Sequence, residues 1–282
     1  PRFRSLWQER RDELVRNATE IAAAIREEME HATSDDAFNS RVHSQAYSQL
    51  RASFDRSAGG FSTAPKFPTP HKVIFLLRCW KRTGEAMALE MARQTLRHMR
   101  QGGVYDQIGF GFHRYSTDAA WRLPHFEKML YDQALMAAAY IEAYQATGDP
   151  EFRSTAEEIF EYVIRDMRDS GGAFYSAEDA DSEGVEGKYY LWQTDEIRRI
   201  ISPGEAEQVI AWFNLADSGN FTDPHQHTPA GSNVLYLSDG APLPSDASDL
   251  DRSPQQPTWE QIRSILLDAR NRRERPMRDD KI

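Results

Sequence analysis

Apolar residues recur every three or four positions over most of the chain, and this spacing predicts a mainly helical protein. Residues 6–29 carry one such pattern with many charged residues between the apolar positions. Residues 36–56 carry a second one, which begins at a capping aspartate and ends before two glycines. Each pattern predicts an amphipathic helix with one packed side and one solvated side.

The central part of the chain predicts two helical hairpins. Residues 70–82 and 85–100 form the first pair, and residues 124–147 and 151–168 form the second, with Pro124 in the first turn of its helix. A glycine ends the first helix of each pair at the turn. Helical hairpins stacked on one another are therefore the expected core.

The hydrophobic patterns in the C-terminal part of the chain are shorter than those in the central part. Residues 188–192 alternate like a strand that residues 233–237 could pair with, and residues 194–213 predict one or two short helices. Residues 238–257 are rich in Ser, Asp and Pro and predict a mobile loop. The last predicted helix covers residues 259–274 and has an apolar face made of Ile262, Ile265 and Leu266.

Three pairs of glycines punctuate the helices, starting at Gly59, Gly102 and Gly171, and an aromatic residue follows each within a few positions. Helix, tight turn, helix and glycine-rich loop is the order expected of stacked hairpin repeats, although the spacing is too uneven for a short solenoid. The sequence thus predicts an all-α class with short β-hairpins in the loops.

Composition narrows the functional classes. The 282 residues include 44 acidic and 34 basic side chains, for a net charge of -10, which disfavours nucleic acid and anionic lipid surfaces as partners. No apolar run is long enough to cross a membrane and no signal-peptide pattern opens the chain, so we expect a soluble cytoplasmic or organelle-matrix protein. The single cysteine, Cys79, lies in an apolar run and predicts a buried thiol.

Residues 102–133 hold the densest set of chemically active side chains. A long polar loop of this kind is often functional. Sugar chemistry needs aromatic faces for the ring, charged groups for hydroxyls, and a carboxylate or histidine to move a proton. The stretch supplies all three types: Tyr105, Asp106, His113, Arg114, Tyr115, Trp121, His125, Glu127, Lys128 and Asp132.

Two interpretations of the end of this stretch remain open. His125 is predicted in the first turn of a helix, where the dipole and free amides favour neutral imidazole able to accept a proton. Alternatively, Lys128 and Asp132 form an i,i+4 pair and Glu127 favours a helix start, so all three could only stabilise the helix.

The other glycine-rich segments offer further candidates. Lys66 lies between two prolines and could face a ligand or solvent. In the third segment, Asp179 and its acidic neighbours could bind hydroxyls, and Trp192 could stack on a ring. The acidic residues resemble the opening of a calcium loop, but Tyr190 stands where a bidentate glutamate is required, so we predict no metal site and no cofactor.

Three strings resemble the spermatogenesis-associated thioredoxin-domain family: GGFSTAPKFPTP, GGVYDQIGFGFHRYSTDAAWRLPHFEKMLYDQ and GGAFYSAEDADSEGVEGKYYLW. In that family a thioredoxin-like domain precedes an (α/α) barrel similar to six-hairpin glycosidases and N-acylglucosamine 2-epimerases. Phe110 departs from the pattern, because the family usually has glycine there.

The resemblance implies an incomplete (α/α) toroid. Residues 1–30 would be a linker helix from an absent thioredoxin-like domain, and residues 31–282 the N-terminal part of the barrel with a loop excursion over residues 214–257. The partners expected are a sugar-like small molecule and the remainder of a longer polypeptide.

Two functions are consistent with this resemblance. In the first, the barrel is a glycoside hydrolase or sugar epimerase. Its acid and base would be drawn from Asp106, His125, Glu127 and Asp179, and its substrate-binding groups would be Lys66, Tyr105, His113, Arg114, Tyr115, Trp121, Lys128, Asp132 and Trp192. In the second, the barrel is a non-catalytic binding scaffold attached to a redox module, since one fold hosts many chemistries.

Overall fold

A computed structural model describes residues 2–31, 41–222, 228–238, 240–244 and 258–279. The chain divides into two compact units, Pro1–Ser44 and Gln45–Ile282. In the first unit, α1 (Arg2–Glu9) and α2 (Arg11–His31) confirm the predicted helical segment, with a break at Arg10. The proposed division into linker helix and barrel remains a prediction.

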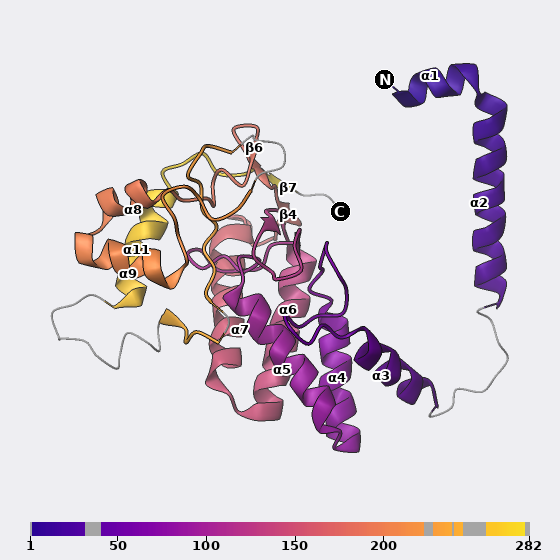
Figure 1. Cartoon of the computed structure of the whole chain (residues 1–282), viewed down its shortest axis with the longest axis horizontal. Helices are drawn as coiled ribbons and strands as arrows, with labels where there is room; N and C mark the ends of the chain where they lie inside the picture. The colour runs from indigo at the N-terminus through magenta and orange to yellow at the C-terminus, as the bar shows by residue number, and fades with distance from the viewer. Residues whose placement is uncertain (1, 32–40, 223–227, 239, 245–257, 280–282) are drawn as a thin grey trace. The chain divides into compact units, whose positions relative to one another are not determined.

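The second unit is built on helical hairpins (Figure 1). Its helical elements are α3 (Arg41–Ser53), which begins in the first unit, α4 (Pro70–Thr83), α5 (Ala86–Gln101), α6 (Leu130–Thr147), α7 (Pro150–Tyr162) and the π-helical turn η1 (Val163–Met167). The pairs α4–α5 and α6–α7 pack as antiparallel hairpins, and α4 also packs on α6. Both predicted hairpins are therefore confirmed, in the arrangement expected of part of an (α/α) toroid.

Alanines and medium-sized apolar residues allow these helices to approach closely. Ala92 and Leu96 of α5 and Ala137 and Tyr140 of α6 are almost completely buried in one core. The Tyr140 hydroxyl donates to the Leu96 carbonyl oxygen at 2.7 Å, so the one polar atom at this contact is paired.

A smaller group of helices forms a second core. It contains α8 (Thr194–Ile200), α9 (Pro203–Trp212) and α11 (Trp259–Arg270), which lie together in Figure 1. Their shared core includes the buried Trp259 of α11. The two short helices predicted for residues 194–213 are confirmed. The predicted mobile loop of residues 238–257 lies mostly outside the described residues. No helix within the described ranges is both long and apolar enough for a bilayer crossing.

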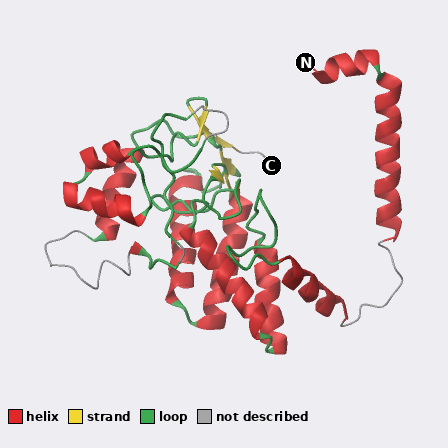
Figure 2. Cartoon of the chain, in the orientation of Figure 1, coloured by secondary structure: helices red, strands yellow, loops and turns green. Residues whose placement is uncertain are grey.

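Short strands lie in the loops at one end of the hairpins (Figure 2). They are β1 (Tyr115–Ser116), β2 (Pro124–His125), β3 (Lys128–Met129), β4 (Ala177–Glu178), β5 (Asp181–Ser182), β6 (Val185–Glu186) and β7 (Arg278–Asp279). The antiparallel ladders are β1–β2, β3–β4–β7 and β5–β6. The strand pair predicted for residues 188–192 and 233–237 is reduced to a single bridge between Trp192 and Asn233.

The start of α6 differs from the prediction. The helix begins at Leu130 and not at Pro124, because β2 and β3 occupy residues 124–129. Residue Tyr115 of β1 pairs with His125, and Glu178 of β4 pairs with Lys128. These tertiary pairings hold the segment extended despite its helical spacing.

A buried ion network joins the loops to α11. The Asp106 carboxylate accepts hydrogen bonds from Nη1 and Nη2 of Arg270, at 2.8 and 2.9 Å, and from the Lys128 ammonium at 2.8 Å. All three side chains are at most 4% exposed. Burial alone would raise the pKa of Asp106, but Arg270 and Lys128 lower it well below its usual range.

Asp106→Asn should strongly destabilise the protein, because it leaves Arg270 and Lys128 as buried cations without a counter-ion. We expect the free energy of unfolding to fall by about 3–5 kcal/mol, as for other broken buried pairs. Urea denaturation followed by tryptophan fluorescence measures this change.

Glu157→Gln is the matched control, because it breaks an exposed pair with Arg153 in which both side chains are 61% exposed. Its expected loss is at most about 1 kcal/mol. If Asp106→Asn cost no more than Glu157→Gln, the network would not be a main stabilising contact.

Candidate functional site

The three glycine-rich segments meet at one end of the hairpins. Lys66 of the first segment and Ser116 of the second exchange two backbone hydrogen bonds, at 2.8 and 2.9 Å. The second and third segments are joined by the β3–β4 ladder, in which Lys128 lies opposite Glu178. Backbone hydrogen bonds therefore join the three segments to one another.

Seven of the predicted site residues are buried: Lys66, Tyr105, Asp106, His113, Trp121, Lys128 and Trp192. Lys66 illustrates their surroundings. Its ammonium donates to Asp55 Oδ2 at 2.7 Å and to the carbonyl oxygens of Gly59 and Ala119 at 2.8 Å each. All three of its N–H donors are thus used within the protein, so it is neither a solvated loop lysine nor a free ligand donor.

Three of the buried aromatic and imidazole side chains are also hydrogen-bonded, whereas the buried Trp192 indole N–H has no partner among the described residues. The Tyr105 hydroxyl donates to Glu158 at 2.6 Å, and the Trp121 indole donates to the Ala58 carbonyl at 2.8 Å. His113 Nδ1 lies 2.9 Å from the Phe126 carbonyl oxygen. Burial and the nearby Lys128 hold the pKa of His113 well below its usual value, so this imidazole is neutral.

Lys128 does not form the i,i+4 pair with Asp132 that the sequence allows. It lies in β3, before the helix, and its ammonium binds Asp106 and the Phe110 carbonyl oxygen at 2.8 Å each. Burial lowers the pKa of Lys128, while Asp106 opposes that change. The purely helix-stabilising alternative is therefore wrong for Lys128.

Six predicted residues are partly exposed, and five of them form a group that we call the His125 cluster: Arg114, Tyr115, His125, Glu127 and Asp132. Arg114 Nη1 donates to Glu127 Oε2 at 2.8 Å. The Tyr115 ring stacks on the His125 ring at 5.0 Å between centroids. Charged, acidic and aromatic groups thus meet at one place on the surface.

His125 lies between two carboxylates. Its Nδ1 is 2.7 Å from Glu186 Oε1, and its Nε2 is 3.5 Å from Glu127 Oε2. The hydrogen bond to Glu186 raises the pKa of His125, although partial burial opposes this. The prediction that a helix dipole keeps His125 neutral is wrong, because α6 begins five residues later and the two carboxylates favour imidazolium.

Asp132, in the first turn of α6, is the most unusual titratable group of the cluster. Burial raises the pKa of its carboxyl to about 7, with a further contribution from Glu127 that Arg114 partly offsets. A carboxyl that titrates near neutral pH can donate or accept a proton under physiological conditions.

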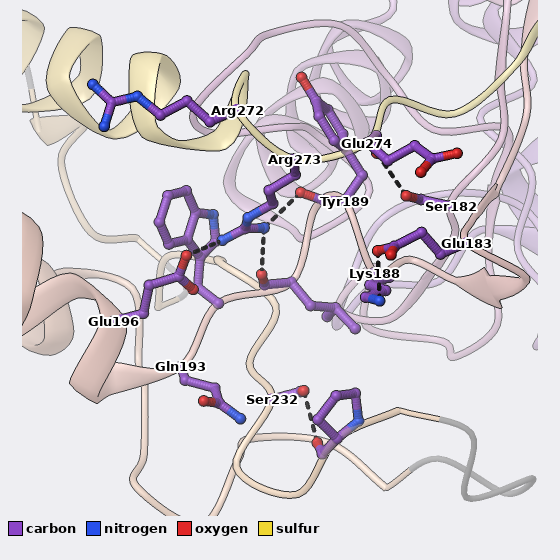
Figure 3. A pocket seen from close by; sticks show the side chains of 13 residues that line it. Ser182, Glu183, Lys188, Tyr189, Gln193, Glu196, Ser232, Arg272, Arg273 and Glu274 are labelled. Carbon is purple, nitrogen blue, oxygen red and sulfur yellow. Dashed lines mark hydrogen bonds and ion pairs between the residues drawn. The ribbon is translucent and has the colours of Figure 1, made fainter.

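Asp179 and Trp192 lie outside this cluster. Asp179 Oδ1 accepts the Ala180 backbone N–H at 2.7 Å, as expected in a tight turn. Trp192 lines a cavity of about 550 Å³ beside the third segment (Figure 3). The Arg273 guanidinium lies 4.2 Å from the centroid of the Trp192 ring and covers it, so this indole is not an open ring platform.

The charges that line this cavity are largely paired with one another. Arg273 donates to Glu196 at 2.8 Å and to two backbone carbonyl oxygens, and Lys188 contacts Glu183 at 2.5 Å (Figure 3). The charged groups of this cavity thus mainly bind one another, whereas the acid-base groups of the His125 cluster are partly buried and partly exposed.

Sequence reasoning missed three residues that shape the site. Phe67 is 45% exposed and its ring lies 4.8 Å from that of Tyr115. Tyr131 is 50% exposed and contributes a hydrogen bond that raises the pKa of Arg114. Arg270 completes the buried network, and the available signal was its place four residues after Leu266 on the buried side of α11.

No group of three or more His, Cys, Asp or Glu side chains in the described part of the chain is arranged to hold a metal ion. His225 and His227, two histidines separated by one residue, lie outside the described residues.

No protein-family model matches the chain. Solved structures with partial similarity include cellobiose 2-epimerase from Spirochaeta thermophila, at 23% identity and a TM-score of 0.43 over 49% of this chain and 39% of that one. A family 76 glycoside hydrolase (mannosidase) from Bacteroides thetaiotaomicron is 16% identical, with a TM-score of 0.40 over 49% and 37% of the two chains.

Similarity to curated proteins is stronger. Human spermatogenesis-associated protein 20 is 34% identical over 306 residues, which cover all of this chain and 39% of the human protein. The rat protein of the same name is 37% identical over 262 residues, which cover 84% of this chain and 33% of the rat protein. On the strength of these matches, the chain belongs to the family of spermatogenesis-associated protein 20, and it spans about two fifths of the human member's length.

Proposed function

We propose that the protein is a carbohydrate-active enzyme, of the hydrolase or epimerase type, and that the His125 cluster is its reaction site. The observation that supports this proposal is the contrast between two neighbouring carboxyl groups. Asp132 has a pKa of about 7, whereas Glu127 is ion-paired with Arg114 at 2.8 Å. Neighbouring carboxyls in such different environments are a common arrangement for an acid and a base.

In this proposal Asp132 supplies the proton. A protonated carboxyl near neutral pH can donate to a sugar oxygen as its bond breaks. Glu127 supplies negative charge that stabilises a developing positive charge or accepts a proton. Arg114 holds Glu127 in place and can donate to a hydroxyl of the sugar.

Hydrolysis and epimerisation make different demands on the same groups. Hydrolysis needs a water molecule or a nucleophile on the side of the sugar opposite the acid. Epimerisation needs a group that removes a proton from carbon and one that returns it to the other face. Since the chain spans about two fifths of its human relative, we expect other parts of a longer polypeptide to contribute the remaining groups.

A binding-only function is the second candidate. It is favoured by the fact that several residues expected to act on substrate, including Asp106 and Lys128, are consumed in a buried ion network. In that case the cluster would hold a sugar-like ligand without turnover. The two functions differ in whether Asp132 affects a rate or only an affinity.

Asp132→Asn should abolish most turnover. The variant keeps the shape of the side chain but cannot transfer a proton, so kcat is expected to fall by about 10²- to 10⁴-fold. Purified protein would be assayed on a panel of disaccharides and nitrophenyl glycosides, with product analysis by chromatography to separate hydrolysis from epimerisation.

Glu157→Gln serves as the control for this assay, because Glu157 is an exposed acid on α7 that pairs with Arg153, away from the residues of the His125 cluster in the sequence. Turnover by the wild type that persists unchanged in Asp132→Asn would exclude the proposed acid. Ligand binding by both proteins without any turnover would favour the binding-only function.

The raised pKa of Asp132 also predicts a pH dependence of stability. Between the usual value of 3.8 and the folded value of about 7, the folded state holds a proton that the unfolded state has released. Stability contributed by this carboxyl is therefore greatest at acid pH and is lost as pH rises from about 4 to about 7.

Asp132→Asn removes this dependence. Relative to the wild type, the variant should gain Tm at pH 8 and show no such gain at pH 4, as measured by differential scanning fluorimetry at both values. An equal difference at the two pH values would mean that the Asp132 pKa is not raised.

A further inference from the structure

An exposed aromatic ring extends the His125 cluster. Phe67 follows the buried Lys66 in the first glycine-rich segment, and 45% of its surface is exposed. Its ring lies 4.8 Å from the Tyr115 ring, which in turn lies 5.0 Å from the His125 ring. The interplanar angles are 32° and 28°, so Phe67 is tilted against Tyr115, Tyr115 stacks on His125, and the three rings follow one another in a row.

The backbone beneath Phe67 is tightly held. Lys66 exchanges two backbone hydrogen bonds with Ser116, next to Tyr115 in β1. The Lys66 ammonium makes three hydrogen bonds at 2.7 to 2.8 Å and lies 5.3 Å from the centroid of the Trp121 ring. These contacts fix the position of Phe67, so its ring is presented at little entropic cost.

We infer that Phe67 is a substrate-positioning residue whose exposed ring stacks on the apolar face of a sugar ring bound at the His125 cluster. This inference rests on the proposed function and adds a residue that sets where the sugar lies. Tyr115 forms the second plane of the row and joins Phe67 to the acid-base groups. Lys66 acts indirectly, by holding the backbone that carries Phe67.

Two features favour a sugar as the ligand. One face of a pyranose presents C–H groups that suit an aromatic plane, and its hydroxyls suit charged donors and acceptors. The row supplies the plane, while Arg114 and Glu127 supply the polar partners at its other end. A purely apolar ligand would leave these charged groups without a role.

Phe174 provides a matched comparison. It is 47% exposed, lies in the third glycine-rich segment and pairs by a backbone bridge with Arg168. The Tyr115 ring of the His125 cluster contacts Phe67, whereas no aromatic contact of Phe174 is found in the described part of the chain. Removing the Phe174 ring therefore tests whether the loss of any exposed ring, away from the His125 cluster, is enough to weaken binding.

The test compares Phe67→Leu, Phe67→Tyr and Phe174→Leu in the whole protein. Binding of glucose, mannose, N-acetylglucosamine, cellobiose, maltose and mannobiose would be measured by isothermal titration calorimetry, and turnover with any sugar that the wild type binds. Phe67→Leu should weaken binding about tenfold and raise KM with kcat changed less than about twofold. Phe67→Tyr should restore wild-type affinity, and Phe174→Leu should match the wild type.

The outcomes separate this inference from the proposed function. Failure of the wild type to bind any sugar on the panel would overturn both. Binding by the wild type that Phe67→Leu leaves unchanged, while Asp132→Asn loses turnover, would overturn only the role of Phe67. Equal losses of sugar affinity in Phe67→Leu and Phe174→Leu would mean that loss of any exposed ring weakens binding. That result would also overturn the role of Phe67.

Discussion

The arrangement of the glycine-rich loops depends on one buried set of charges, Asp106 with Arg270 and Lys128. These residues come from the second loop, the end of α11 and β3, so a single carboxylate connects the hairpin core to the C-terminal helix. Space for the contact comes from Gly109, where an added Cβ would lie 1.8 Å from Arg270 Nη2. Because a buried charge without its partner is costly, the loops can adopt this conformation only when all three groups are in place.

Arginines near the C-terminal end of the described chain extend the same principle. Arg263 donates to the Ile108 carbonyl oxygen and lies 4.0 Å from the Phe110 ring, and Arg275 binds Asp166 at 2.7 Å. Phe110 has a left-handed backbone, with φ of 69°, a conformation that glycine adopts without strain, so the glycine expected from the resemblance would suit this position. Its burial and the contact with Arg263 compensate for the strained conformation. Both α11 and the segment after it therefore hold the second glycine-rich loop and η1 in place.

The helical hairpins could be predicted because their information is local. Apolar spacing, a first-turn proline in α7 and a glycine after α4 fix the bounds of these helices to within a residue or two. The start of α6 could not be predicted in this way, since residues 124–129 have helical spacing but pair with β1 and β4. Arg270 was overlooked for a related reason: it occupies the buried side of α11, and only the loop that reaches it from residue 106 shows why. Ile265, expected on that side, is 44% exposed.

Sequence reasoning named candidate residues for the site but could not separate the buried from the exposed ones, and the reason lies in the hydrogen bonding of the loops. A long segment without regular structure leaves carbonyl oxygens that need donors. Lys66 binds the carbonyls of Gly59 and Ala119, and Lys128 binds that of Phe110, so cations that looked suited to a ligand serve the backbone instead. Asp132 differs from these cations because no hydrogen bond to its carboxyl is found in the described part of the chain. Its pKa therefore responds to burial and to the charges of Arg114 and Glu127. The proposed proton transfer accordingly rests on an acid near these loops that the loop backbone does not bind.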